Sequence, residues 1–173
     1  MYGLEVIKIT LVLILCILAI VDDAKSCKIY NFHTAFFTIS GIILNFIFYK
    51  FNGFVQALLG WLFPVSCLFV LYALRMLGAG DIKLIGAIGA IMGPSFAFYV
   101  MVYSFFTGAL IAMVIVIASK DFRTRIKYFI TYLKNCFLTM KISTYGELSH
   151  EKGKGCFRFA YAVLPAVLIR VVL

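Results

Sequence analysis

The chain has little charge and very few acidic residues. Of its 173 residues, 13% are charged, seven are Asp or Glu and two are His, whereas 64% are hydrophobic. A soluble domain has roughly a quarter of its residues charged and about half apolar. This chain therefore has more apolar side chains than a water-facing fold of its length could bury. The composition excludes intrinsic disorder and a secreted disulfide scaffold, and it indicates a protein that crosses a membrane several times.

Cysteine and histidine are too sparse and too scattered for a metal site. The five cysteines never show CxxC spacing, and Cys16 and Cys67 lie inside apolar runs. A structural zinc site takes about four Cys or His ligands, and two histidines supply no cluster. We therefore expect no metal ion and no organic cofactor, and we interpret the cysteines as small apolar residues.

Six apolar stretches follow one another along the chain. Most approach the ~20 residues that a helix needs to cross ~30 Å of hydrocarbon. They predict an all-α integral membrane protein in which residues 1–173 form a single domain, a bundle of six transmembrane helices. The stretches comprise residues 4–21, 32–49, 54–74, 82–93, 95–119 and 156–173.

The fourth stretch is shorter than the others. Pro94, preceded by Gly93, is expected to end its helix, because proline cannot continue one. From Asp81 to Gly93 the helix would measure roughly 20 Å, which is ~10 Å less than the hydrocarbon core. Either Pro94 only kinks a longer helix, or one end of this helix is recessed in the membrane. We favour the second alternative, with the Asp81 end recessed and reached by water.

The basic residues predict the orientation in the membrane. Thirteen of the 16 Lys and Arg residues lie in segments 22–31, 75–83 and 120–158. Cytoplasmic loops carry the excess of Lys and Arg, so these segments are expected in the cytoplasm and both termini outside. The net charge of +9 then indicates contact with anionic lipids and no nucleic acid. Apolar residues at helical spacing within 122–140 predict a cytoplasmic amphipathic segment between helices five and six, or an extension of helix five.

Three aspartates stand where a carboxylate is costly. Asp22 and Asp23 end the first stretch, and Asp81 begins the fourth, so the predicted topology places all three at the same membrane edge. Two carboxylates held close together share one proton. The ionised partner can then activate water, and the protonated partner can protonate the leaving amine, as in an aspartic protease. On spacing alone, Asp81 is equally well explained as a capping residue of its helix, after the turn at Gly78 and Gly80.

Two motifs make the chain recognisable. The run GAGDIKL at residues 78–84 resembles the GxGDxKL signature of type IV prepilin peptidases, which are bacterial membrane aspartic peptidases. The run DAKSCKIYN at residues 23–31 is similar to the family's D-x-[KR]-x-x-x-I-P-N motif, with Tyr30 in place of its proline. The resemblance implies that Asp23 and Asp81 are the catalytic pair. It also implies supporting positions in the two motifs, namely Lys25, Asn31, Gly78, Gly80 and Lys83.

The resemblance also implies a substrate and a location. Family members cleave the short basic leader of a prepilin or pseudopilin just before its apolar helix, at the cytoplasmic side of the bacterial inner membrane. Longer members carry paired CxxC motifs and an N-methylation activity. Because this chain begins almost directly with its first apolar stretch and has no CxxC, we expect the peptidase activity alone.

Other polar residues are expected to have structural roles. We interpret Lys25 and Lys83 as interfacial anchors, Asn31 as a helix cap, and His33 as packed or interfacial. Asp22 is a candidate for recognising the basic leader.

Two other functions use the same aspartates. A small ion- or proton-coupled transporter or channel predicts ion flux. An intramembrane protease like presenilin shares GxGD, but the Tyr-Asp context and the PAL motif of that group are absent.

Overall fold

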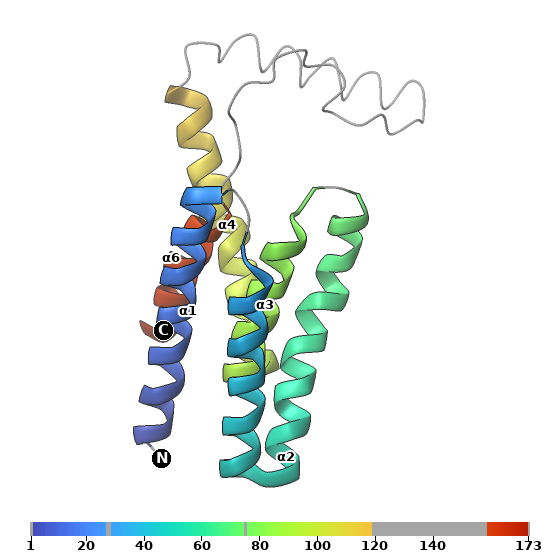
Figure 1. Ribbon diagram of the computed structural model, residues 1–173. Helices are drawn as coiled ribbons and strands as arrows, with labels where there is room; N and C mark the ends of the chain where they lie inside the picture. Colours follow the sequence, from blue (N-terminus) through green and yellow to red (C-terminus); the bar gives the residue numbers. More distant parts are fainter. Residues whose placement is uncertain (1, 27–28, 75, 119–158, 173) are drawn as a thin grey trace. The chain divides into compact units, whose positions relative to one another are not determined.

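The computed structural model describes residues 2–26, 29–74, 76–118 and 159–172, and all regular structure in these ranges is helical. The helices are α1 (Tyr2–Ser26), α2 (Asn31–Ala73), α3 (Ala79–Met92), α4 (Pro94–Ala118) and α6 (Ala160–Val172), shown in Figure 1. The predicted all-α class is confirmed. The predicted amphipathic segment at 122–140 lies outside the described residues. Residues 1–109 and 158–173 form one compact unit, and this unit contains the features discussed below.

The described residues hold five helices, so the predicted count of six is not confirmed. The second and third apolar stretches are joined in the 43-residue α2, which leaves helical geometry only at Lys50 (φ 52°, ψ −137°). Figure 1 shows the chain reversing its direction at the foot of α2. The reversal is tight because Gly53 has no side chain, and a Cβ there would overlap the carbonyl oxygen of Asn45. The two stretches are therefore two arms of one helical hairpin.

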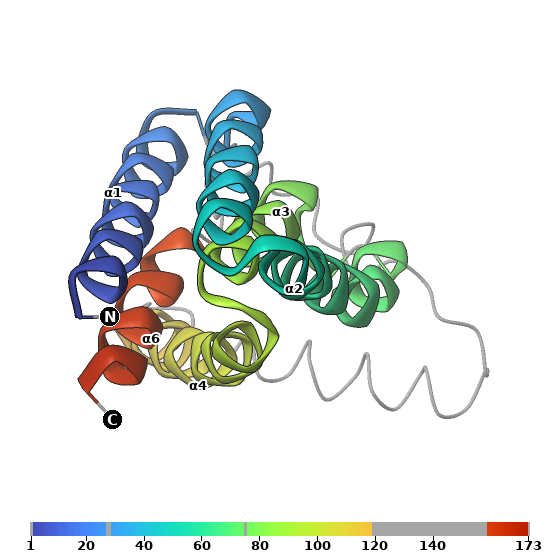
Figure 2. The same ribbon diagram turned by 90° about the horizontal axis from the view of Figure 1, so that it is seen from below.

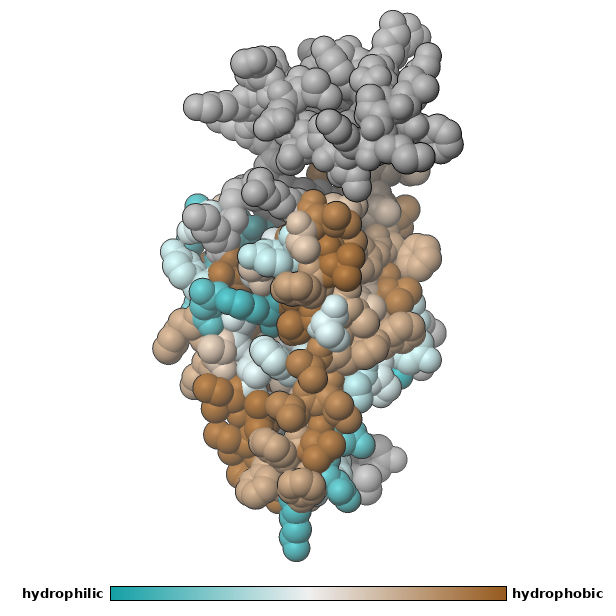
Figure 3. All heavy atoms as spheres, turned by 90° about the vertical axis from the view of Figure 1, so that its right-hand side faces the viewer, coloured by the Kyte–Doolittle hydropathy of each residue, from teal (hydrophilic) through white to brown (hydrophobic). Residues whose placement is uncertain are grey.

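Three helices are long and apolar enough to cross a membrane. The candidate spans are Gly3–Ser26, Asn31–Ala73 and Pro94–Ile115, whereas α6 is a shorter apolar helix. Many large apolar side chains of α2 are exposed, among them Ile39, Phe46 and Phe69. Figure 3 shows apolar side chains over much of the face that includes α2. Such a surface suits hydrocarbon rather than water, which confirms that the chain is a membrane protein.

The short α3 forms the core of this unit. It ends at Met92, Gly93 takes a positive φ of 94°, and Pro94 begins α4, so the predicted break is confirmed. Every residue from Leu84 to Ile91 is buried. A helix that is apolar all round is expected to be enclosed on all sides by other helices. At 14 residues, or roughly 21 Å, α3 is shorter than a membrane span.

The two arms of α2 contact α3 backbone to backbone. A Cβ added to Gly60 would overlap the carbonyl oxygen of Gly89, and a Cβ added to Gly89 would overlap that of Gly60. On the other arm, the amide Nδ2 of Asn45 donates to the carbonyl oxygens of Ala90 and Ile91, both at 3.0 Å. Asn45 therefore joins α2 to α3 through its side-chain amide. These contacts fix α3, and so the position of Asp81, against the α2 hairpin.

The helix α1 packs on the other side of the same core. Its buried side chains Val12, Leu15 and Ala19 belong to one apolar cluster with residues of α3 and α6. Both ribbon views place α6 beside α1 (Figures 1 and 2). Thr107 of α4 donates to the carbonyl oxygen of Ala162 at 2.8 Å, which links α4 to α6. The end of α1 is therefore held near the beginning of α3.

Candidate active site

The end of α1, the linker residues Ile29 and Tyr30, and the first turn of α3 meet at one end of this unit. Ile29 of the linker touches the first turn of α3, where a Cβ added to Gly80 would lie 3.1 Å from the Cβ of Ile29. Asp23 is in the last turns of α1, and Asp81 is the third residue of α3. Two aspartates separated by 58 positions are thus carried by neighbouring elements.

Asp23 and Asp81 affect each other electrostatically. Asp23 is 5% exposed, and Asp81 is half-buried outside the three candidate spans. Burial and, to a smaller extent, the negative charge of Asp23 raise the pKa of Asp81 to about 6, against the opposing effect of the backbone N–H of Gly78. A neighbouring carboxylate has this effect only at short range. The two carboxylates therefore lie close enough for the charge of Asp23 to affect the proton of Asp81.

Asp81 also has the capping role that the spacing predicts. Gly78 is the N-cap residue of α3, and its N–H donates to the Asp81 carboxylate. A carboxylate in the first turn also interacts favourably with the helix dipole. Gly78 itself has an ordinary φ of −74°, so the motif glycines do not serve a left-handed turn. Gly78 leaves space for the carboxylate of Asp81, because a Cβ on Gly78 would lie 3.0 Å from Asp81 Oδ2.

Two of the predicted supporting residues bind each other. The Lys83 ammonium donates to Asn31 Oδ1 at 2.8 Å, which joins α3 to the beginning of α2. The prediction that Asn31 caps α2 is wrong, because Tyr30 is the N-cap residue and makes no capping bond with its side chain. The Asn31 side chain is drawn to Lys83 instead. Lys25 is exposed in the last turn of α1, as an interfacial anchor would be.

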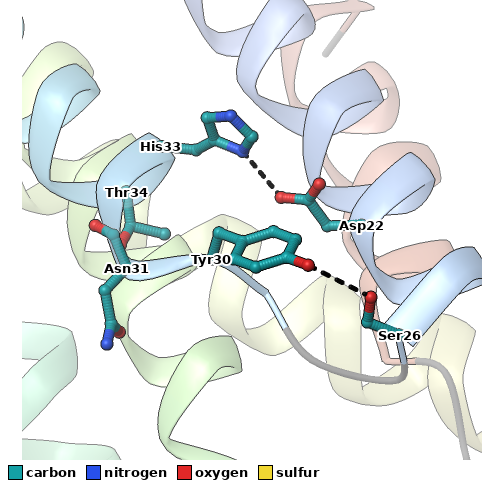
Figure 4. Close-up of polar contacts among 6 residues, drawn as sticks. All are labelled: Asp22, Ser26, Tyr30, Asn31, His33 and Thr34. Atoms are coloured by element: carbon teal, nitrogen blue, oxygen red, sulfur yellow. Dashed lines mark hydrogen bonds and ion pairs between the residues drawn. The ribbon is translucent and has the colours of Figure 1, made fainter.

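A contact that the sequence did not predict lies beside these residues. His33 Nδ1 is 2.6 Å from Asp22 Oδ2, and Figure 4 shows the imidazole turned toward this carboxylate. Asp22 is only 7% exposed. Since its carboxylate is buried and engaged by His33, we do not assign leader recognition to Asp22. The sequence does contain the signal: a His in the first turn of one helix and an Asp in the last turns of the preceding one.

A pocket adjoins the beginning of α3. It is lined by the last turn of α2 and the loop that leads into the motif: Tyr72, Ala73, Met76, Leu77, Gly78 and Ala79. Gly78 therefore both lines the pocket and donates to Asp81. The lining is mainly apolar, with backbone polar groups near the motif. Among the described residues, no three His, Cys, Asp or Glu side chains come together as metal ligands would.

These features define a class: a helical membrane protein with two coupled carboxylates at the ends of two of its helices. The type IV leader peptidase family matches residues 10–113, a segment that contains both aspartates and both motifs. The chain belongs to this family, and it is a peptidase with a protein substrate. No curated protein matches the chain, and no solved structure does.

Proposed function

We propose that the chain is an aspartic endopeptidase that removes the leader of type IV prepilin-like proteins, with Asp23 and Asp81 as its catalytic pair. The observation that carries the proposal is that Asp23, buried near the end of α1, and Asp81, half-buried in the first turn of α3, lie on adjoining elements, close enough for the charge of Asp23 to raise the pKa of Asp81. Membership of the family supports peptide hydrolysis. The GxGD motif at Asp81 and the second motif at Asp23 support the aspartic type.

We assign the two carboxylates different roles. Burial and Asp23 both raise the pKa of Asp81, which supports Asp81 as the group that keeps the shared proton and leaves Asp23 as the partner that activates water. Asp23 takes a proton from water as the oxygen attacks the scissile carbonyl, while Asp81 donates a hydrogen bond to the carbonyl oxygen. As the tetrahedral intermediate breaks down, Asp81 gives its proton to the leaving amine, and the proton that Asp23 took from water then passes to Asp81. The reaction consumes one water and returns both carboxyl groups to their initial states.

The position of the pair fits a substrate cut at a membrane boundary. A prepilin has a basic leader in the cytoplasm and an apolar helix in the bilayer, so its scissile bond lies where the two meet. Asp81 lies in the first turn of a helix too short to span the bilayer, and the exposed Lys25 and Lys83 flank the pair in sequence. Lysines at such positions favour the cytoplasmic side and anionic lipids. We therefore place the reaction at the cytoplasmic face of the bacterial inner membrane.

A direct assay tests the proposal. The purified chain in detergent or liposomes is incubated with a prepilin that has Gly before the cut, and the products are identified by mass spectrometry. We expect a single cleavage between the basic leader and the apolar helix. A matched prepilin with a bulky residue in place of that Gly is expected to be cleaved much more slowly. Ion flux through liposomes containing the chain, with no cleavage, would instead support a transporter.

The rate of cleavage is expected to fall as the pH rises through about 6. Asp81 loses its proton with a pKa of about 6, and above that value the pair has no proton to donate. The fall in kcat/KM should approach tenfold for each pH unit, because one protonated group is required. The measurement is kcat/KM for the prepilin between pH 5 and 8, with far-UV circular dichroism confirming the fold at each pH. A profile that stays flat to pH 8 would contradict the assignment of Asp81 as the acid.

A further inference from the structure

The contact between Asp22 and His33 fastens the end of α1 to the first turn of α2. The distance from His33 Nδ1 to Asp22 Oδ2 is 2.6 Å. Asp22 is buried, so little water competes for its carboxylate. An imidazole N–H donating to a carboxylate at this distance makes a strong, charge-assisted hydrogen bond. Asp22 directly precedes Asp23, and a bond to Asp22 therefore fixes the backbone that carries Asp23.

The same turn of α2 also reaches α3. Asn31 Oδ1 accepts a hydrogen bond from the Lys83 ammonium at 2.8 Å, and Lys83 lies two residues after Asp81. Thr34 Oγ1 donates back to the carbonyl oxygen of Asn31 at 3.1 Å. The single turn Asn31–Thr34 thus contacts both helices that bear the catalytic pair of the proposed function.

The imidazole is itself held in place. The rings of Tyr30 and Phe32 lie edge-on to it, with centroids 6.2 and 6.1 Å away. By contrast, a second side-chain contact from the end of α1, that of Ser26 with Tyr30 of the linker, is exposed and 3.4 Å long. Figure 4 shows both contacts crossing from α1 to the beginning of α2. Of the two, only the His33 contact is short and shielded.

We infer that His33 is a positioning residue of the peptidase: through Asp22 it fixes the end of α1, and so sets Asp23 at its working distance from Asp81. This inference rests on the proposed function. His33 acts on Asp23 through its contact with Asp22. Displacement of a catalytic group by about 1 Å can lower a rate roughly a hundredfold. Loss of the His33 bond is therefore expected to lower kcat and to leave KM nearly unchanged.

The test compares His33→Ala, His33→Gln, Asp22→Asn and the double variant Asp22→Asn/His33→Ala in the prepilin assay. We expect His33→Ala and Asp22→Asn each to lower kcat about tenfold or more, with KM within about twofold. The double variant should have the same kcat as the less active of the two single variants, because both changes remove the same contact. His33→Gln, whose amide N–H can still donate to Asp22, should recover part of the lost rate. Ser26→Ala, which removes the exposed contact in the same linker, is the matched control and should keep the wild-type kcat.

Several outcomes would overturn the inference. An unchanged kcat in His33→Ala would overturn it. So would a loss of kcat in the double variant equal to the product of the two single losses, because the two residues would then act independently. A rise in KM alone would assign the pair to substrate binding instead. Thermal unfolding of every variant is measured alongside. Should His33→Ala fail to fold, His33→Gln and Asp22→Asn decide the matter, because both keep side-chain volume.

A second measurement separates this inference from the proposed function. A wild-type chain that cleaves no prepilin would contradict the function but not the positioning role of His33. The carboxyl pKa of Asp81 can then be followed by NMR of the chain labelled with ¹³C-aspartate. In His33→Ala the charge of Asp23 is no longer held near Asp81, so the pKa of Asp81 should fall toward its ordinary range. An unchanged pKa in His33→Ala would contradict the positioning role whatever the substrate is.

Discussion

Asp81→Asn is expected to abolish prepilin cleavage and, above pH 6, to make the folded chain more stable. The activity is lost because the amide cannot deliver the proton that the leaving amine needs, and a general acid contributes roughly 10²–10⁴-fold to a rate. We expect a fall of about 10³-fold or more in kcat. Asp23→Asn should reduce kcat by a similar factor, because the variant has no ionised carboxylate to activate water.

The gain in stability follows from the direction of the pKa change. Burial and Asp23 raise the pKa of Asp81 in the folded chain from 3.8 to about 6, so folding favours the protonated carboxyl. The contribution of Asp81 to the free energy of unfolding is therefore fully present below pH 3.8 and is lost as the pH rises through 6. Asparagine has no charge to desolvate, and its carbonyl oxygen can still accept from Gly78. At pH 8 the variant should therefore be more stable by on the order of 2 kcal/mol, and at pH 4 the difference should vanish.

These two effects are measured together on the same preparation. Cleavage is followed with the prepilin, and unfolding is followed by circular dichroism in detergent at pH 4 and pH 8. Glu5→Gln is the control for cleavage, because Glu5 is an exposed carboxylate on the same helix as Asp23, and it should leave kcat unchanged; since the charge of Glu5 supports that of the buried Lys8, this variant should not become more stable at pH 8. Full turnover by Asp81→Asn would end the proposal of an Asp23/Asp81 pair. A loss of cleavage accompanied by lower stability at pH 8 would assign Asp81 to capping alone.

Hydropathy predicted most of the fold but not how α2 is built. Runs of about 20 apolar residues located the membrane helices, and the Gly93-Pro94 pair located the boundary between α3 and α4. The gap between the second and third apolar stretches did locate the reversal near Lys50, but it did not show how tight the turn is, since lysine rarely adopts a positive φ. The signal lies instead at Gly53, three residues later, where the arms come too close for any side chain. A close approach of two backbones depends on tertiary packing, which periodicity does not record.

The candidate site was predictable where it depends on topology. Counting crossings placed Asp23 and Asp81 at the same membrane edge, and the structure brings them close enough to interact. Contacts between side chains were not predictable in the same way. Asn31 was expected to cap its own helix, yet its side chain binds Lys83 from another element, 52 positions away. His33 was expected only to pack, because its partner Asp22 lies on a different helix.

The position of Asp81 depends on a contact far from it. Gly89 of α3 and Gly60 of α2 touch backbone to backbone, and this contact sets how close α3 lies to the α2 hairpin. Gly89 is eight residues, or roughly 12 Å along the helix, from Asp81. Because a helix moves as a rigid element, a displacement at Gly89 is transmitted to the turn that carries the carboxylate. The geometry proposed for catalysis is thus maintained in part by two residues with no side chain.

Gly89→Ala is expected to damage both stability and cleavage. Its methyl group would overlap the carbonyl oxygen of Gly60 and would lie 3.0 Å from the Cβ of Ala97, so α3 must move away from both α2 and α4. Overpacking of this kind costs about 1–3 kcal/mol, and a shift of about 1 Å at Asp81 would reduce kcat roughly a hundredfold. Stability is measured by circular dichroism in detergent, and kcat is measured with the prepilin, as for Asp81→Asn. The control is Gly3→Ala, where a Cβ meets nothing within 4 Å and wild-type behaviour is expected. Wild-type stability and kcat in Gly89→Ala would show that α3 has room to shift without disturbing Asp81, and would contradict a rigid link between the glycine contact and the catalytic pair.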